Sequence, residues 1–363
     1  MKITELDKYK IIEKIRHDYP AKYRSCVKFG DCTVCITTNL KKMNEYLEEY
    51  FMPFVTQVHN PDIELTAHEA ESPEFEASFT VKEPEPGKTR IKEEYINLPL
   101  GRIVRKRLTG MVFVFGEGEN LAIGPCMDNL NQVINFVNNR YIEWLLCTNG
   151  GLLGHASGVV RGEDNKGLAI AGFAGAGKST LALHLMRKNL KFVSNDRIII
   201  EKSGSSLIMN GVAKLPRINP GTALNNPNLS GILSSNDRER FSGMPLDELW
   251  NLEYKYDVPI DECFGPSSFV TRAVMPVLII LNWKHNSGSF IAREVDLSVR
   301  RDLLPAFMKS TGLFFLPYQS CRMPEAIEES YIDFLSLCRI WEFSGSIDFD
   351  AGVDACLEIL KGV

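Results

Sequence analysis

The stretch from Gly172 to Thr180 constrains the fold of this 363-residue chain more than any other feature. It reads Gly-Phe-Ala-Gly-Ala-Gly-Lys-Ser-Thr, which is the G-x-x-x-x-G-K-S pattern of a phosphate-binding loop. Its glycines allow a tight turn whose backbone N–H groups point inward and can hold a phosphate. In this pattern Lys178 brings a positive charge to the β- and γ-phosphates, and Ser179 offers a hydroxyl to Mg²⁺. We therefore predict a nucleotide site made by Gly172, Phe173, Ala174, Gly175, Ala176, Gly177, Lys178, Ser179 and Thr180.

The residues on either side of the loop fit the same interpretation. Residues 167–171 form a short apolar run, as expected of a buried strand. Residues 181–189 are a run of helix formers with several leucines. A strand, a glycine loop and a helix N-terminus together make an anion site, to which the helix dipole adds. The structural alternative is a chance glycine turn, which the complete pattern in this context disfavours.

Composition and charge exclude several classes of protein. The chain is 44% apolar and 24% charged, which is ordinary for a globular protein, and its net charge is -5. This charge argues against a nucleic-acid-binding protein. No apolar run approaches the roughly 20 residues that cross a bilayer, and the N-terminal residues lack the apolar region of a signal peptide. We therefore expect a cytoplasmic protein with neither a nucleic-acid nor a membrane partner.

The cysteines form one recognisable pattern. There are nine of them, an odd number, and Cys32 and Cys35 make a C-x-x-C. No second pair follows at the spacing of a zinc site, and the residues around the pair resemble a strand. Buried thiols are therefore favoured over a metal or redox pair.

The apolar patterns predict two domains. We place the boundary before a long helix with an apolar stripe, which gives a smaller N-terminal α+β domain of residues 1–125 and a C-terminal α/β domain of residues 126–363. In the N-terminal domain, helices are expected at 8–17 and 40–54 and a hairpin at 27–37. In the C-terminal domain we expect strands at 155–160, 191–194 and 274–283, a hairpin across 198–209, a polar lid or insertion at 225–265 with a short helix at 245–252, and helices at 296–309, 324–342 and 350–361.

An acidic residue follows the strand expected at 191–194. Asp196, preceded by Asn195, ends this strand. An acid at a strand end beside a phosphate loop can hold Mg²⁺, directly or through water, or take a proton from an attacking hydroxyl. The structural alternative is an aspartate that caps a helix or stabilises a turn.

The order of these motifs resembles the HPr kinase/phosphorylase family, and more closely its branch of HPr-kinase-related kinases of the kinase B type. The resemblance covers about residues 126–320. It implies a C-terminal P-loop core akin to phosphoenolpyruvate carboxykinase, with ATP and Mg²⁺ as cofactors. The motifs that carry it are His155, the glycine loop, Ser194-Asn-Asp-Arg197, Pro216-Arg-Ile-Asn-Pro-Gly-Thr222, and Arg272 before an apolar strand.

The resemblance also implies catalytic roles. His155 would assist transfer near the γ-phosphate, and Lys178 would neutralise the developing charge. Asp196 would accept the proton of the acceptor hydroxyl and, together with Ser179, hold the metal. Arg272 would stabilise the transferred phosphoryl group. Without the resemblance, His155 would be interpreted as a core or surface histidine.

The same resemblance places Arg217 and Asn219 on the acceptor side, with Asn219 as a weak substitute for a metal ligand. The chain departs from the family pattern nearby. Asn195 stands where the family has a second acid, residues 214–219 contain no acid, and Thr180 replaces a glutamate. These differences favour an acceptor other than HPr, and they put phosphorolysis in question.

Together these motifs predict an ATP-dependent phosphotransferase. It would move the γ-phosphoryl group of ATP to a hydroxyl of a protein serine or of a small metabolite. The alternatives are a nucleotide-binding regulatory module and an ATPase with weak or no kinase activity. The hexamers of the family it resembles imply a possible homo-oligomer.

Overall fold

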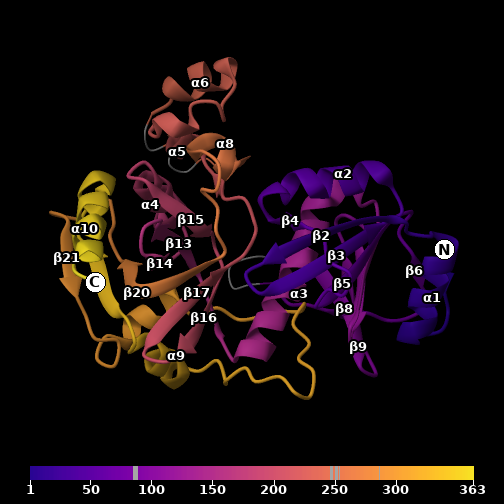
Figure 1. The fold of residues 1–363 in the computed structure, drawn as a ribbon. Helices are drawn as coiled ribbons and strands as arrows, with labels where there is room; N and C mark the ends of the chain where they lie inside the picture. The colour runs from indigo at the N-terminus through magenta and orange to yellow at the C-terminus, as the bar shows by residue number, and fades with distance from the viewer. Residues whose placement is uncertain (85–88, 246–247, 250–251, 253, 286) are drawn as a thin grey trace. The chain divides into compact units, whose positions relative to one another are not determined.

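The chain forms two compact units of mixed α/β structure. The computed structural model describes residues 1–84, 89–245, 248–249, 252, 254–285 and 287–363 (Figure 1). The first unit comprises Met1–Thr148 together with Thr311–Cys321, and the second comprises Asn149–Ser310 together with Arg322–Val363. The division falls about twenty residues after the boundary expected at 125/126.

The first unit is built on one large sheet. Within the described residues this sheet has nine strands, in the order β4-β2-β3-β5-β11-β10-β9-β8-β7. The predicted hairpin is present as β2 and β3. The strands are β2 (Tyr23–Phe29), β3 (Cys32–Thr38), β4 (Val55–Thr56), β5 (Ile63–Glu69), β7 (Thr80–Val81), β8 (Glu93–Leu98), β9 (Gly101–Lys106), β10 (Val112–Gly116) and β11 (Glu119–Gly124), with a separate pair β1 (Lys2–Ile3) and β6 (Glu74–Phe75).

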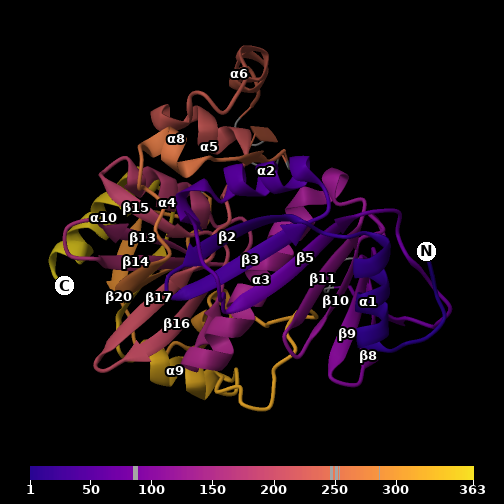
Figure 2. The ribbon, with the colours of Figure 1, turned by 45° about the vertical axis from the view of Figure 1, so that its right-hand side comes forward.

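Amphipathic helices cover this sheet. Helix α1 (Lys8–Asp18) is capped by Asp7, whose carboxylate accepts a hydrogen bond from the Lys10 N–H. The helix lies beside β10 (Figure 2). Its isoleucines are buried among apolar residues of β9, β10 and β11. Helix α2 (Lys41–Tyr50) is shorter than expected and continues into the 3₁₀ turn η1 (Met52–Phe54).

The long helix α3 (Leu130–Asn149), preceded by the 3₁₀ turn η2 (Met127–Asn129), was expected to open the second domain. Its contacts explain why nearly all of it belongs to the first unit instead. Phe136 packs on Phe113 and Phe115 of β10, with ring centroids 4.9 and 5.9 Å apart. Such aromatic contacts bury large apolar surfaces, so the helix completes the core of the first unit.

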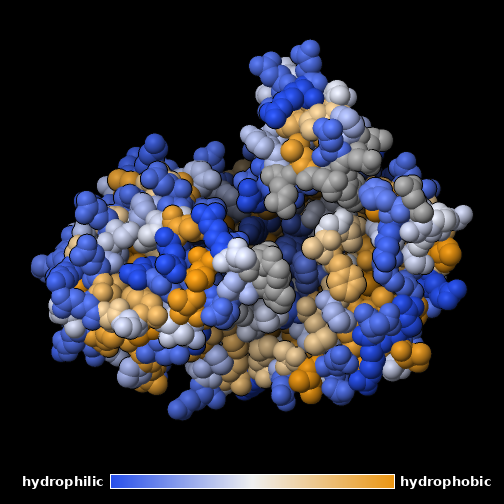
Figure 3. All heavy atoms as spheres, turned by 180° about the vertical axis from the view of Figure 1, so that it is seen from behind, coloured by the Kyte–Doolittle hydropathy of each residue, from blue (hydrophilic) through white to orange (hydrophobic). Residues whose placement is uncertain are grey.

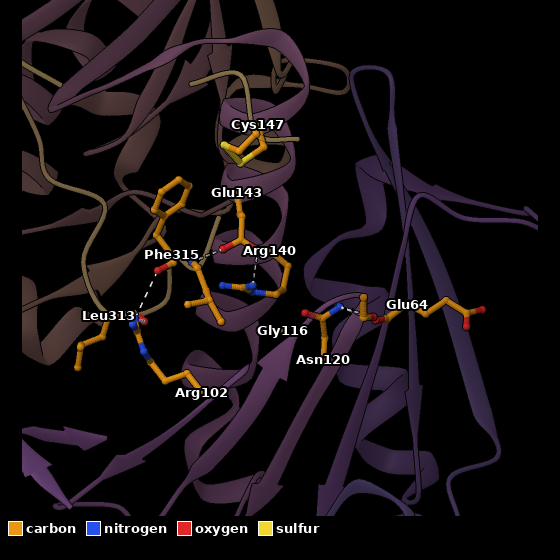
Figure 4. A network of polar contacts seen from close by, with 12 residues as sticks. Glu64, Arg102, Gly116, Asn120, Arg140, Glu143, Cys147, Leu313 and Phe315 are labelled. Carbon is orange, nitrogen blue, oxygen red and sulfur yellow. Dashed lines mark hydrogen bonds and ion pairs between the residues drawn. A yellow bond between two sulfur atoms is a disulfide. The ribbon is translucent and has the colours of Figure 1, made fainter. Parts of the chain in front are cut away.

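A returning segment, residues 311–321, completes the first unit. Arg102 donates a hydrogen bond to the carbonyl of Leu313 at 2.7 Å (Figure 4). The carboxylate of Glu143 accepts a hydrogen bond from the Leu316 N–H at 2.6 Å. An irregular segment lacks the regular backbone hydrogen bonds of a helix or sheet. Side chains that bond to its N–H and C=O groups satisfy these groups instead and hold the segment in place.

The expectation of core thiols in the C-x-x-C pattern is confirmed for Cys32 and wrong for Cys35. Cys35 of the C-x-x-C pattern is disulfide-bonded to Cys26, which lies directly opposite it in the hairpin of β2 and β3. Cys147 of α3 is bonded to Cys321 of the returning segment. Cys32 is a buried free thiol. The two cysteines of the pattern are therefore not bonded to each other.

The second unit has a mixed sheet that carries the glycine loop. Within the described residues its strands run in the order β12-β16-β17-β20-β14-β13-β15, with β22 beside β20 and β21 beside β22. The β14–β20 and β20–β22 pairs are parallel and the other pairs are antiparallel. The strands are β12 (Leu152–Gly154), β13 (Ala156–Arg161), β14 (Lys166–Gly172), β15 (Leu190–Ser194), β16 (Ile198–Ser203), β17 (Ser206–Gly211), β20 (Arg272–Leu281), β21 (Ile291–Glu294) and β22 (Arg339–Ser344), with a separate pair β18 (Arg217–Ile218) and β19 (Tyr256–Asp257).

The C-terminal part differs from the expected series of helices. Residues 296–309 contain only the 3₁₀ turn η4 (Arg301–Ala306), in which Pro305 removes a backbone donor. The helix expected at 324–342 is the shorter α9 (Glu328–Leu335), and β22 follows it. Ile340 and Phe343 of β22 are buried in the sheet, so tertiary packing decides their conformation. The last expected helix is present as α10 (Phe349–Lys361).

The polar region expected as a lid or insertion contains short helices. They are α5 (Pro220–Leu224), η3 (Pro227–Leu229), α6 (Ser235–Ser242) and α8 (Ile260–Phe264). Hydrophilic side chains cover its tip around α6 (Figure 3). The short helix expected at 245–252 includes residues outside the described ranges. None of the helices traced in the described parts of the chain is long and apolar enough to span a bilayer.

Candidate functional site

The glycine-rich loop joins the end of β14 to the start of helix α4 (Lys178–Met186). Gly175 and Gly177 have φ angles of +79° and +87°, a region that glycine adopts at little cost. Gly177 is also the N-cap of α4, and a Cβ there would lie 2.7 Å from the ring of Phe349. Backbone conformation and space therefore both require glycine at this position.

Aromatic side chains support the loop from outside. The indole Nε1 of Trp283 donates a hydrogen bond to the Ala176 carbonyl at 2.8 Å. Phe349, the first residue of α10, packs edge-on against Trp283 and stacks on His184 of α4. Helix α10 lies beside α4 (Figure 1). These contacts fix the loop through rigid elements, as a preorganised anion site requires.

Lys178 lies folded over the loop. Its Nζ donates hydrogen bonds to the carbonyls of Gly172 at 2.7 Å and of Phe173 at 3.3 Å. Burial lowers the pKa of Lys178 to about 8, with the charge of Lys309 acting in the same direction and that of Asp196 opposing it. A bound anion would stabilise the charged form of this lysine.

Asn195 connects the loop to the end of β15. Its Oδ1 accepts hydrogen bonds from the hydroxyls of Ser179 and Ser157, the latter at 3.0 Å. A neutral amide, not a carboxylate, is therefore the group in contact with the loop hydroxyl. Amide and hydroxyl oxygens suit Mg²⁺, so Ser179, Asn195 and Asp196 are the residues that could hold it. Within the described ranges no three His, Cys, Asp or Glu side chains gather as a metal cluster.

Asp196 has a φ angle of +70°, which is uncommon for a residue with a side chain. Nε2 of His155 lies 3.0 Å from its Oδ1, and Nζ of Lys309 lies 3.5 Å from the same oxygen. Nε of Arg197 lies 3.8 Å from Oδ2. Unusual backbone conformations of this kind concentrate at functional sites.

The environment of Asp196 keeps its carboxyl group ionised. Burial opposes ionisation, but the hydrogen bond with His155 and the positive charges of Lys309 and Arg197 outweigh it. Together they hold the pKa of the Asp196 carboxyl well below its usual range. A carboxylate is therefore present at neutral pH.

Lys309 is a residue of the site that the sequence motifs did not indicate. It follows η4, where the Phe307 carbonyl accepts a hydrogen bond from the His155 N–H at 2.6 Å and Met308 bridges to Gly154. This pairing brings Lys309 to Asp196 although 113 residues separate them. No local sequence pattern surrounds Lys309. Its place in the site could be predicted only from the pairing of residues 307–308 with residues 154–155.

The segment that carries Arg217 and Asn219 lies beside the start of α4. The hydroxyls of Thr222 and Thr180 are 2.8 Å apart. Arg217 pairs with Asp257 of the neighbouring β19, with 3.4 Å between Nε and Oδ1. The Oδ1 of Asn219 is buried and has no hydrogen-bond partner among the described residues. Both predicted acceptor-side residues are therefore on a segment adjoining the loop.

Arg272 is not brought to the loop, which differs from its expected place at the phosphoryl group. It begins β20, which runs parallel to β14 with Val274 opposite Lys166 and Leu281 opposite Gly172. The loop follows Gly172, so Arg272 is at the other end of the strands, roughly 30 Å away along β20 at about 3.3 Å per residue. There it pairs with the buried Glu201 at 2.6 Å.

Comparisons with known proteins give only weak similarity, and only to solved structures. No protein-family model matches the sequence, and no curated protein matches it. Among solved structures, that of the HPr(Ser) kinase/phosphatase from Coxiella burnetii is similar, with a TM-score of 0.29 and 12% sequence identity. The match covers 58% of this chain and 95% of that chain. A similarity of this degree carries no argument about chemistry.

Proposed function

We propose that the second unit binds ATP with Mg²⁺ and transfers the γ-phosphoryl group to the hydroxyl of an acceptor. One observation carries this proposal: an ionised Asp196 lies within 3.0 Å of His155 and next to Lys309, at the end of β15 beside the glycine loop. A carboxylate held by a histidine and a lysine can take the proton from the acceptor hydroxyl while that hydroxyl lies next to the γ-phosphate.

In this proposal the loop positions the triphosphate. Backbone N–H groups of the loop and the N-terminus of α4 would hold the β-phosphate, and Lys178 would leave its carbonyl partners for the phosphate oxygens. Ser179, Asn195 and Asp196 supply oxygens for Mg²⁺. When bound, Mg²⁺ would neutralise part of the charge of the phosphates.

The chemical step then needs little more than positioning. The acceptor oxygen forms a bond to the γ-phosphorus, the bond to the β–γ bridging oxygen breaks, and ADP leaves. Asp196 orients the hydroxyl and takes its proton. A weak base suffices, because the proton becomes acidic once the oxygen is bonded to phosphorus. His155 and Lys309 hold the carboxylate in place, and Lys178 and Lys309 stabilise charge on the transferred group.

The neutral side chain of Asn195 favours a second candidate, a nucleotide-binding regulatory module or an ATPase with weak or no kinase activity. With one carboxylate at the loop, the site has less capacity to hold Mg²⁺ and activate an acceptor at once. Several features stay predictions. They are a protein serine or small metabolite as acceptor, homo-oligomerisation, the absence of a nucleic-acid partner and a cytoplasmic location.

Incubation of the purified protein with γ-labelled ATP and fractionated cell extract tests the proposal. The wild type should label an acceptor, and Asp196→Asn should lower labelling about 100-fold or more while it retains ATP binding. Asp333→Asn, an exposed aspartate on α9, is the matched control and should label normally. Undiminished labelling by Asp196→Asn would contradict the proposal. Acceptor-independent phosphate release would indicate the ATPase, and binding without any turnover the regulatory module.

A further inference from the structure

We infer that the acceptor is itself an anion, a small hydroxyl compound that also carries a carboxylate or a phosphate, held by Lys214 together with Arg197 and Arg217. This inference rests on the proposed phosphoryl transfer and names the class of its acceptor. It comes from the way positive charges are distributed around Asp196.

The two oxygens of Asp196 face different groups. Oδ1 is the oxygen contacted by His155 at 3.0 Å and by Lys309 at 3.5 Å. Lys178 of the loop interacts electrostatically with Asp196 and Lys309, so this side is the nucleotide side. Oδ2 instead faces Arg197, with 3.8 Å between the oxygen and Nε.

Lys214 lies on the Arg197 side. Its electrostatic neighbours are Arg197, Asp196, Arg217 and Asp257. The fold brings it there through a short turn after β17, in which the Lys214 N–H donates to the Val212 carbonyl at 2.7 Å. The same turn is tied to the end of β15, because the Val212 N–H donates a hydrogen bond to the Ser194 hydroxyl at 3.1 Å.

The Lys214 ammonium group lacks a direct partner. Its side chain is half-buried, and it makes no hydrogen bond or ion pair with any described residue. Partly burying a charge without a partner costs free energy, which an anion in contact with it would offset. Two arginines next to this lysine raise the cost further and strengthen the attraction for an anion.

The balance of charge gives the same answer. Among the described residues the cations of the site outnumber the carboxylates, with Lys178, Arg197, Lys214, Arg217 and Lys309 against Asp196 and Asp257. The triphosphate would take up the charge on the loop side. The excess of positive charge near Lys214 would stay uncompensated if the acceptor were neutral. A carboxylate or phosphate on the acceptor would compensate it by accepting hydrogen bonds from lysine and arginine.

The half-buried position of Lys214 favours a small molecule over a protein side chain. A compact anion can enter a partly buried site and place its own hydroxyl next to Asp196, a few bonds from the charged group. Polar groups that fix orientation in this way are typical of small-molecule sites.

Matched acceptors test the inference. Glycerol, glycerate and glycerol 3-phosphate share a hydroxylated carbon chain and differ in charge, and a serine peptide flanked by acids represents a protein acceptor. Each is incubated with the full-length protein, Mg²⁺ and γ-labelled ATP. We expect transfer to one or both anionic small molecules and none to glycerol. Preferred transfer to glycerol or to the peptide would overturn the inference.

A variant separates the acceptor from the nucleotide. Lys214→Met should raise the KM of the anionic acceptor about 10-fold, the effect of losing about 1.4 kcal/mol, and leave the KM of ATP within twofold. Lys214→Arg should restore the acceptor KM. Lys202→Met, which removes a lysine paired with Asp333, is the control. An unchanged acceptor KM in Lys214→Met, or an equal rise in the KM of ATP, would contradict the assignment.

A second measurement holds even if none of these compounds is phosphorylated. With ADP and Mg²⁺ present, glycerol 3-phosphate or glycerate should slow modification of Lys214 by an amine-reactive reagent, and glycerol should not. Protection without transfer would count against the proposed transfer and support the anion site. No protection by either anion would overturn the anion site, whatever the outcome for phosphoryl transfer.

Discussion

Nε2 of His155 lies 3.0 Å from Oδ1 of Asp196, and this contact joins the residue between β12 and β13 to the turn that follows β15. Both ends of the contact are fixed by the backbone. The His155 N–H donates to the Phe307 carbonyl, and the Ser194 side chain donates to the Arg197 carbonyl across the turn that holds Asp196. The histidine therefore orients the carboxylate and lowers its pKa.

Replacing His155 by alanine should slow phosphoryl transfer by at least about 10-fold and leave ATP affinity nearly unchanged. The variant loses the hydrogen bond that favours the ionised Asp196, so the pKa of that carboxyl should rise. Activity requires the carboxylate and falls as pH drops through its pKa. The acidic limb of the kcat/KM profile should therefore move to higher pH than in the wild type. An acidic limb that stays in place would show that His155 does not act through Asp196.

Binding of ATP should be coupled to proton uptake near pH 8.5. In the free protein burial lowers the pKa of Lys178 to about 8, so part of the lysine is neutral at this pH. The phosphates favour the charged form and raise the pKa, so a proton is taken up when ATP binds. Affinity should accordingly weaken as pH rises above 8. Calorimetric titrations in buffers of different ionisation enthalpy measure the proton directly.

The matched variant for this effect is Lys178→Arg, because arginine stays charged at every pH used. Lys178→Arg should bind ATP without proton uptake at pH 8.5, and with lower affinity than the wild type. Equal uptake in both proteins would assign the proton to another group.

Arg272 should matter for stability and not for nucleotide binding. It pairs at 2.6 Å with Glu201, which is 6% exposed, and it donates to Asn210 at 3.0 Å. Arg272→Ala leaves a buried carboxylate without its cation and should lower the free energy of unfolding of the second unit by about 1–3 kcal/mol. Arg339→Ala, which breaks the exposed pair with Glu294, should cost less than about 1 kcal/mol. Urea unfolding measures the stability of each variant, and titration with ATP measures its affinity for the nucleotide. If Arg272→Ala lost ATP affinity and Arg339→Ala did not, a purely structural role of Arg272 would be contradicted.

Glu143 should hold the returning segment 311–321 in the first unit. It pairs with the buried Arg140 at 2.8 Å and accepts the Leu316 N–H (Figure 4). Glu143→Gln keeps the shape and removes the charge, so Arg140 loses its counter-ion. We expect a loss of about 3 kcal/mol in the first unit and faster hydrogen exchange in residues 311–321. Glu49→Gln, on helix α2, is the control. Unchanged exchange in the segment would show that Glu143 does not anchor it.

How much of this structure can be predicted from sequence depends on the range of the interactions. The strand, loop and helix from residue 167 to 186 follow from a local glycine pattern between two apolar runs, and so does the hairpin of β2 and β3. The first four residues of β22, 339–342, are wrongly predicted as the end of a helix, because this segment becomes a strand by pairing with β20, some sixty positions earlier in the chain.

The candidate site shows the same limit. His155, Asp196 and Lys178 were found as members of a motif, and the structure brings them together. Lys309 reaches Asp196 only through the pairing of residues 307–308 with the chain around His155. The prediction that Arg272 contacts the phosphoryl group is wrong, because the sequence does not reveal that β20 runs parallel to β14. This direction puts Arg272, the first residue of β20, at the end of the strands away from the loop.

The central claim is that the glycine loop holds the triphosphate of ATP within reach of Asp196. Hydrogen–deuterium exchange of peptides covering residues 172–186, with and without Mg²⁺–ATP, tests it most directly, with Lys178→Met beside the wild type. We predict that ATP slows exchange in these peptides and in the peptide that contains Asp196 in the wild type, and that Lys178→Met abolishes the effect. If ATP left the loop unprotected, or protected only another part of the chain, the claim would be wrong.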